Sequence, residues 1–106
     1  TEILPPHDHQ MRAVLGVYRG RERNILYRRV NDRTFPAGEL TLSAGQFHVF
    51  GPDDIHAVQA LDGAVSLGLH IYLGPLSKAK RSLFDWVSGD PLPMSEAAFL
   101  DMKRAV

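Results

Sequence analysis

Two histidines stand two positions apart near the start of the sequence, in Pro6-His7-Asp8-His9. On an extended strand successive side chains alternate between the two faces, so His7 and His9 point the same way. About 6 to 7 Å of backbone separates them, and both imidazoles can therefore reach one ion at about 2.0–2.1 Å. A third ligand has to come from elsewhere. His56 is the best placed, because it lies where the turn over residues 51–54 meets the next apolar run.

The spacing alone also fits two polar side chains on an exposed strand. The face of His7 and His9 continues into Met11, Ala13 and Leu15, however, which should be buried, and a buried imidazole needs a partner. Three histidines suit zinc, iron, copper or nickel, and ligand softness does not choose among these metals. Three protein ligands also leave positions open for water or substrate, as in catalytic sites.

A second pair of polar side chains lies in the strongly alternating run over residues 64–73, where His70 and Tyr72 share a face. A hydroxyl beside an imidazole can orient a substrate or pass a proton, and a structural hydrogen-bonded pair fits the spacing equally well. We expect this face to line the pocket. The opposite face needs cover from another element or another subunit, and it consists of Val65, Leu67, Leu69 and Ile71. His48 is expected to be an ordinary core or surface histidine, and Asp8 to serve the turn.

Short strands separated by Gly and Pro turns have to position these residues. We expect an extended lead-in over residues 1–6, a strand from His7 to Val17, a turn at 19–22, and strands over 24–30, 39–43, 46–50, 55–61 and 64–73. Further turns are expected at 31–33, 35–38, 44–45 and 51–54, and a hairpin at Asp62-Gly63. Ser95 should cap a terminal helix of about ten residues. This pattern predicts an all-β fold, either a double-sheet jelly roll or a small barrel.

Composition limits the classes of function. The 106 residues form one domain at most, and Lys plus Arg and Asp plus Glu number 12 each, so no net charge attracts nucleic acid or an anionic membrane. The basic run Lys78-Ala79-Lys80-Arg81 is expected to be a solvated loop rather than a phosphate patch. The sequence contains no cysteine, which excludes disulfides and thiolate sites and suits the reducing cytoplasm. No apolar run approaches the roughly 20 residues of a membrane helix.

Read together, these segments resemble the cupin motifs. Gly45-x5-Gly51-Pro52-x3-His56 resembles the second motif, and Pro6-His7-Asp8-His9 followed by Gly20 resembles the first. The cupin glutamate normally follows the second histidine after three or four intervening residues, where this chain has Ala13 and Val14. The resemblance therefore implies a site of three histidines without a carboxylate.

With this departure, the sequence resembles one branch of the cupins, the thiol dioxygenases. These comprise the cysteine dioxygenases and, closer in spacing, the bacterial 3-mercaptopropionate dioxygenases. The resemblance runs from His7 to Tyr72 and includes the segments Gly16–Glu22, Ile55–Val58 and Leu69–Tyr72. It implies a cupin double-stranded β-helix over residues 1–106 with a short C-terminal helix. Because the chain begins almost at its proposed ligands, we expect further N-terminal strands to precede it in a longer protein. Those strands, or a homodimer partner, would cover the apolar face.

The resemblance also implies an activity. Fe(II), with zinc or nickel as alternatives, would be held by His7, His9 and His56, and both oxygen atoms of dioxygen would pass to the sulfur of a small thiol. His70 and Tyr72 match the last two members of the family's Ser-x-His-x-Tyr triplet.

Gly68 stands where the family has its serine, so the orientation of His70 has to come from Ser66 or from water. Ala13 stands where the animal enzymes have cysteine, so their cysteine–tyrosine crosslink cannot form. The residue that binds the substrate carboxylate lies upstream of the histidine pair in relatives. Two alternatives stay open: a metal-binding cupin that senses or binds a small molecule without turnover, and a different oxygenase that cleaves, for instance, a diketone.

Overall fold

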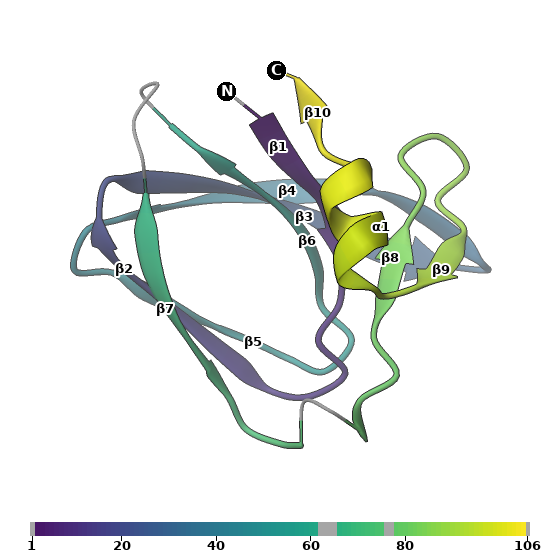
Figure 1. The fold of residues 1–106 in the computed structure, drawn as a ribbon, viewed down its shortest axis with the longest axis horizontal. Coiled ribbons are helices and arrows are strands. Elements are labelled where there is room, and N and C mark those ends of the chain that lie inside the picture. Colours follow the sequence, from purple (N-terminus) through teal and green to yellow (C-terminus); the bar gives the residue numbers. More distant parts are fainter. Residues whose placement is uncertain (1, 62–65, 76–77, 106) are drawn as a thin grey trace.

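A computed structural model describes residues 2–61, 66–75 and 78–105. Within these ranges the chain consists mainly of antiparallel strands, so the all-β prediction is confirmed at this level (Figure 1). The elements are β1 (Glu2–His7), β2 (Ala13–Arg19), β3 (Arg21–Val30), β4 (Arg33–Ser43), β5 (Phe47–Phe50), β6 (Ile55–Ala60), β7 (Leu67–Tyr72), β8 (Ser82–Phe84), β9 (Pro91–Pro93), α1 (Glu96–Asp101) and β10 (Arg104–Ala105). No helix in the described ranges has the length and apolarity needed to span a bilayer.

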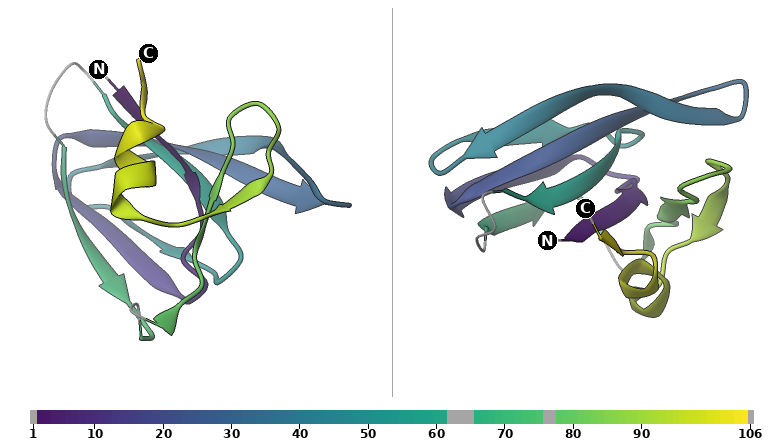
Figure 2. Two further views of the ribbon diagram at one scale, coloured as in Figure 1. Left: turned by 45° about the vertical axis from the view of Figure 1, so that its right-hand side comes forward. Right: turned by 90° about the horizontal axis from the view of Figure 1, so that it is seen from above.

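The strands form two sheets that face each other. The larger sheet has the order β4-β3-β6-β1-β8-β9, with β10 paired to β1, and the smaller has the order β5-β2-β7. Figures 1 and 2 show the smaller sheet lying opposite the larger one. The buried cluster between them consists of Leu15, Val17, Leu42 and Phe50, with Leu26 and Leu40 packed against it.

The connection between β1 and β2 differs from the sequence prediction of one strand from His7 to Val17. The strand β1 ends at His7, β2 begins at Ala13, and the chain crosses between the two sheets in the segment that joins them. Gln10 causes the break, because it adopts a left-handed φ of 55° and its backbone N–H donates to Pro52 O at 3.0 Å. The predicted burial of alternate side chains is nevertheless found at Met11, Ala13, Leu15 and Val17.

The residues before His7 form a strand rather than an extended lead-in. Pro5 and Pro6 are buried within β1, at a place where its register with β6 shifts between Leu4 and His7. Proline has no N–H to donate to a ladder, and such an irregularity accommodates it.

The turn predicted over residues 35–38 from Pro36 and Gly38 is wrong, because these residues lie inside β4. The strand β4 is at the edge of the larger sheet, where a proline is tolerated within a strand. Gly38, at a φ of 145°, accompanies a register shift opposite Leu26 and Tyr27.

The turns and the helix cap agree better with the predictions. Asn31 and Asp32 have φ values of 51° and 63°, which is typical of the tight turn that joins β3 to β4. Ser95 caps α1, and its hydroxyl accepts from the backbone N–H of Ala98 at 3.1 Å. The helix has six residues rather than about ten, because the chain after Met102 turns into β10. The Asp62-Gly63 hairpin lies outside the described residues.

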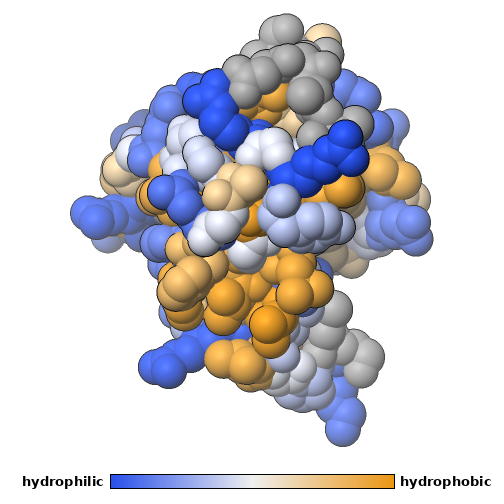
Figure 3. Space-filling model, turned by 90° about the vertical axis from the view of Figure 1, so that its left-hand side faces the viewer, coloured by the Kyte–Doolittle hydropathy of each residue, from blue (hydrophilic) through white to orange (hydrophobic). Residues whose placement is uncertain are grey.

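The outer face of the smaller sheet is apolar and exposed. Leu69 and Ile71 on β7, predicted to need cover, are 61% and 48% exposed, and no other element of the described chain packs over them. They continue onto Phe47 and Val49 of β5, which are also exposed. Figure 3 shows apolar side chains gathered on this side of the molecule. Val65 of the same predicted face lies outside the described residues.

Candidate metal centre

The three histidines predicted to meet lie together. One nitrogen from each of His7, His9 and His56 can be chosen so that all three lie within 4.8 Å of one another. The ring centroids are 5.3 Å apart for His7 and His9, 4.6 Å for His7 and His56, and 5.1 Å for His9 and His56. All three side chains are buried, with 1–5% of their surface exposed. The cluster could therefore bind a metal ion.

The larger sheet and the connection that leads from it to β2 position these rings. His7 ends β1 and lies opposite His56 of β6 in the antiparallel register. His9 belongs to the connection to β2, which the Gln10–Pro52 hydrogen bond holds close to the start of β6. Phe50 packs behind the cluster, with its ring centroid 4.3 Å from that of His56 and 5.7 Å from that of His9.

Hydrogen bonds on the Nδ1 side determine the tautomers of two of the rings. His7 Nδ1 donates to Pro5 O at 2.9 Å, and His56 Nδ1 donates to Asn24 Oδ1 at 2.8 Å. A carbonyl oxygen can only accept, so each Nδ1 carries the proton and each Nε2 keeps its lone pair. Such an arrangement is common for metal-binding histidines.

Two nitrogens of the cluster are buried without a hydrogen-bond partner, His56 Nε2 and His9 Nδ1. Buried polar atoms are nearly always paired in proteins, and each exception needs an explanation. A metal ion among the three rings would provide one, so the residues present fit such a group.

The electrostatics of the cluster favour neutral rings. Burial is the main cause that lowers the pKa of His7 to about 3 and that of His9 to about 4, and the positive charge of Arg81 contributes to both shifts. Burial, with the charges of His7 and His9 next, also lowers the pKa of His56 well below its usual value. All three rings are therefore unprotonated at neutral pH, as metal ligation requires.

The acidic residues near the motif are not placed as ligands. Asp8 is buried, but its carboxylate accepts from the backbone N–H of Ser82 at 2.8 Å and from Gln10 Nε2 at 2.7 Å. It therefore supports the connection after β1, as predicted. Glu39 lies on the exposed strand β4, where it pairs with Arg23.

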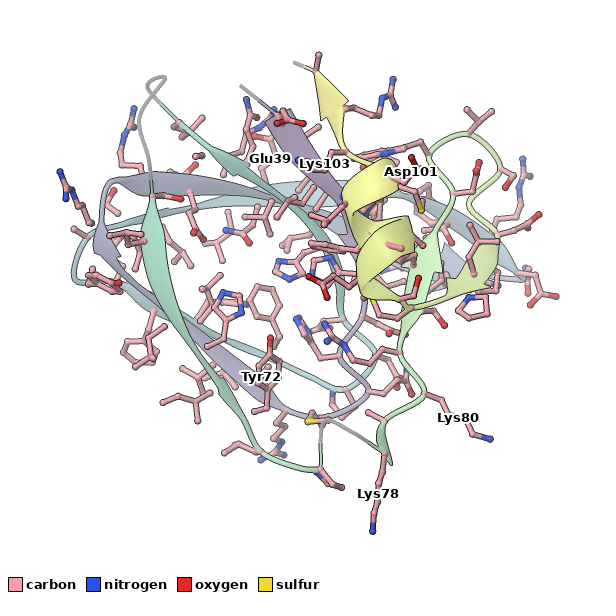
Figure 4. All side chains as sticks on the ribbon, viewed as in Figure 1. Glu39, Tyr72, Lys78, Lys80, Asp101 and Lys103 are labelled. Carbon is pink, nitrogen blue, oxygen red and sulfur yellow. The ribbon has the colours of Figure 1, made fainter. Side chains whose placement is uncertain are left out.

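A cavity of about 470 Å³ adjoins the cluster and is bordered by His7. His70 and Tyr72 both line it, and His70 Nδ1 lies 3.3 Å from Tyr72 Oη. The Tyr72 ring is 6.0 Å from that of His9, and its side chain lies on the inner side of β7 (Figure 4). A larger cavity of about 660 Å³ is lined by Tyr27 and Asp54 among others, but by none of the histidines.

The sequence analysis missed Arg81, which also lines the cavity at the cluster. Lys78 and Lys80 are exposed and point away from the protein, as expected for a solvated loop (Figure 4). Arg81 instead donates from Nε to Asp8 O at 3.1 Å, and its guanidinium lies 5.7 Å from the centre of the Tyr72 ring. In the sequence, only its position directly before the segment Ser82-Leu83-Phe84 could have indicated that Arg81 is partly buried, because a buried strand begins there.

The sequence analysis expects Ser66 or water to orient His70, but Ser66 forms its hydrogen bond with Glu22 instead. Its hydroxyl donates to Glu22 Oε1 at 3.0 Å. The protein partner found for His70 is Tyr72. Desolvation lowers the pKa of His70, and the negative charge of Glu22 acts in the opposite direction.

The sequence matches no family model and no curated protein. The fold and the site therefore define only a broad class. The protein is an antiparallel β protein with a buried cluster of three histidines that could bind a metal ion.

Proposed function

We propose that this protein is a cupin of the thiol dioxygenase type, an Fe(II)-dependent oxidoreductase that adds dioxygen to the sulfur of a small thiol such as cysteine or 3-mercaptopropionate. The observation that carries the proposal is the convergence of His7, His9 and His56, neutral and buried, beside a cavity. Iron is preferred over zinc or nickel because of the resemblance in sequence, since the donor set alone accepts all three.

When bound, the ion would lower the pKa of a coordinated thiol and hold the two reactants within reach of each other. His7, His9 and His56 would hold it. Leu4, Val58 and Phe99 give part of the cavity an apolar wall. Charge interactions beside an apolar wall are stronger than in bulk water.

Arg81 supplies a cation for the carboxylate of the substrate. Its Nε is occupied by Asp8 O, and no hydrogen bond from its two terminal nitrogens is found within the described chain. A guanidinium binds a carboxylate through two parallel hydrogen bonds. This residue therefore fills the role that relatives give to one upstream of the histidine pair.

His70 and Tyr72 would accept or donate a proton at the cavity wall. The Tyr72 hydroxyl can donate to His70 Nδ1, 3.3 Å away, and desolvation lowers the pKa of His70, which favours the neutral imidazole that can accept. The pair can then hold or release a proton at Tyr72 Oη, next to the bound substrate.

The experiment is metal analysis of the purified protein combined with an oxygen electrode. We expect bound iron, and oxygen uptake on addition of cysteine or 3-mercaptopropionate. Substitution His56→Ala should abolish both iron binding and uptake, whereas His48→Ala, outside the cluster, should preserve both. Absence of oxygen uptake by the iron-loaded protein with a panel of small thiols would refute the proposal.

Gly68 favours a second candidate, a metal-binding cupin that binds a small molecule without turnover. A Cβ at this position would lie 3.1 Å from both Gly16 O and Leu15 Cδ1, so the site has little room for the serine of the family. This candidate predicts tight binding of zinc or nickel, and stabilisation by a ligand without oxygen consumption.

A further inference from the structure

We infer that Glu22 makes this cavity selective for a thiol that also carries an ammonium group. The inference rests on the proposed function, because it names the substrate class of the same site. It assigns Glu22 as a specificity-determining residue that binds the cationic end of the ligand.

The carboxylate of Glu22 is buried and only half satisfied. Glu22 lies on β3, is 7% exposed, and lines the cavity that borders His7. Its Oε1 accepts from the Ser66 hydroxyl at 3.0 Å, whereas its Oε2 is buried with no hydrogen-bond partner. A buried carboxylate oxygen without a partner is costly, and a cationic ligand would satisfy it.

The described chain offers Glu22 no cation of its own. Arg81 lines the same cavity, but its Nε donates to Asp8 O and it forms no ion pair with Glu22 among the described residues. His70 also lines the cavity, but the hydrogen bond found for its ring joins it to Tyr72 and not to Glu22. The negative charge is thus available to a ligand.

Gly68 lies next to this carboxylate. A Cβ at position 68 would lie 3.6 Å from Glu22 Oε1, the oxygen that accepts from Ser66. A larger side chain at position 68 would therefore crowd the carboxylate, and glycine does not.

The cavity therefore presents the carboxylates of Glu22 and Glu96 and the guanidinium of Arg81, on walls that also include the metal-cluster residue His7. Glu96 is exposed to solvent, so Glu22 is the buried one of the two carboxylates. Two opposite charges separated by an apolar space complement a small zwitterion. An α-amino acid with a thiol side chain carries an ammonium for Glu22, a carboxylate for Arg81 and a sulfur for the metal. By contrast, 3-mercaptopropionate leaves Glu22 without a partner.

The test is calorimetric titration of the purified, iron-loaded protein under nitrogen, where binding can be measured without turnover. The ligands are cysteine, 2-aminoethanethiol, which has the ammonium alone, and 3-mercaptopropionate, which has the carboxylate alone. We expect Glu22→Gln to weaken the binding of cysteine and 2-aminoethanethiol by about tenfold or more, since a charge-assisted bond is lost. Binding of 3-mercaptopropionate should not weaken.

Two control variants separate this role from a structural one. Asp101→Asn removes an exposed negative charge at the end of α1, at a residue that does not line the cavity, and should leave all three affinities unchanged. Ser66→Ala removes the structural hydrogen bond to Glu22 and should preserve the order of the affinities.

The outcomes distinguish this inference from the proposed function. Preference of the wild-type protein for 3-mercaptopropionate over cysteine would overturn the inference even if Glu22→Gln failed to fold. Equal weakening of all three ligands by Glu22→Gln would also overturn it, and oxygen uptake would then still support the dioxygenase. Ammonium-selective binding without any oxygen uptake would support the role of Glu22 and refute the dioxygenase.

Discussion

The buried histidines predict that acid destabilises the metal-free protein. In the folded state burial lowers the pKa of His7 to about 3 and that of His9 to about 4, and it lowers the pKa of His56 well below normal. In the unfolded chain each imidazole has a pKa of about 6.5. Below that pH the unfolded state binds more protons than the folded one, so the free energy of unfolding falls as the pH falls.

The magnitude follows from the same values. Between pH 7.5 and pH 5.5 an unfolded imidazole passes from about one-tenth to about nine-tenths protonated, while the three folded rings stay neutral. Integration over this range gives somewhat more than about 1 kcal/mol for each ring, and about 4 kcal/mol for all three. That loss is a large part of the roughly 5–15 kcal/mol that stabilises a typical domain. It continues until the pH approaches the folded pKa values of 3 to 4.

The assay is urea unfolding of chelator-treated protein at several pH values, followed by the fluorescence of Trp86, the single tryptophan. We expect the free energy of unfolding to decrease steadily from pH 7.5 to pH 5.5. Substitution His9→Leu should remove about one-third of this pH dependence. A free energy of unfolding that is the same at both ends of the range would refute neutral burial of the cluster.

Three further predictions concern single side chains. Asn24→Leu removes the acceptor of His56 Nδ1 and should lower metal affinity by about 10- to 100-fold; chelator competition measures this, and unchanged affinity would contradict the role. Leu83→Ala empties a fully buried position beside His7 and should cost about 2–5 kcal/mol of stability, against less than about 1 kcal/mol for the exposed Leu92→Ala in the same denaturation assay. Gly68→Ser brings a Cβ to 3.1 Å from the backbone oxygen of Gly16 and should destabilise the fold by about 1–3 kcal/mol; a higher melting temperature would show that the neighbours yield.

The histidine cluster could be predicted because residue type and burial pattern agree at each of its positions. The alternation that continues from His9 into Leu15 indicated a buried face, and burial of an imidazole implies a partner. The same alternation could not reveal that the chain leaves one sheet and enters the other at Gln10. A left-handed residue changes the direction of the chain without interrupting the count of buried side chains.

Other features depend on partners that are distant in sequence. Pro36 marks a turn in most contexts, and only the place of β4 at a sheet edge allows it within a strand. Arg81 reads as part of a charged loop, and the pairing of β8 with β1 at Leu83 and His7 brings it to the cavity. The half-satisfied carboxylate of Glu22 likewise arises from tertiary packing.

The two hydrogen bonds that orient His7 and His56 differ in how mutation can affect them. The acceptor for His7 is the main-chain carbonyl of residue 5, which every one of the twenty amino acids supplies. The acceptor for His56 is the side chain of Asn24, which a single nucleotide change can remove. Random mutation should therefore disturb the orientation of His56 far more often than that of His7. In a library of point variants selected for metal retention, substitutions at position 24 should be rare. At position 5 any residue that preserves the strand should be tolerated.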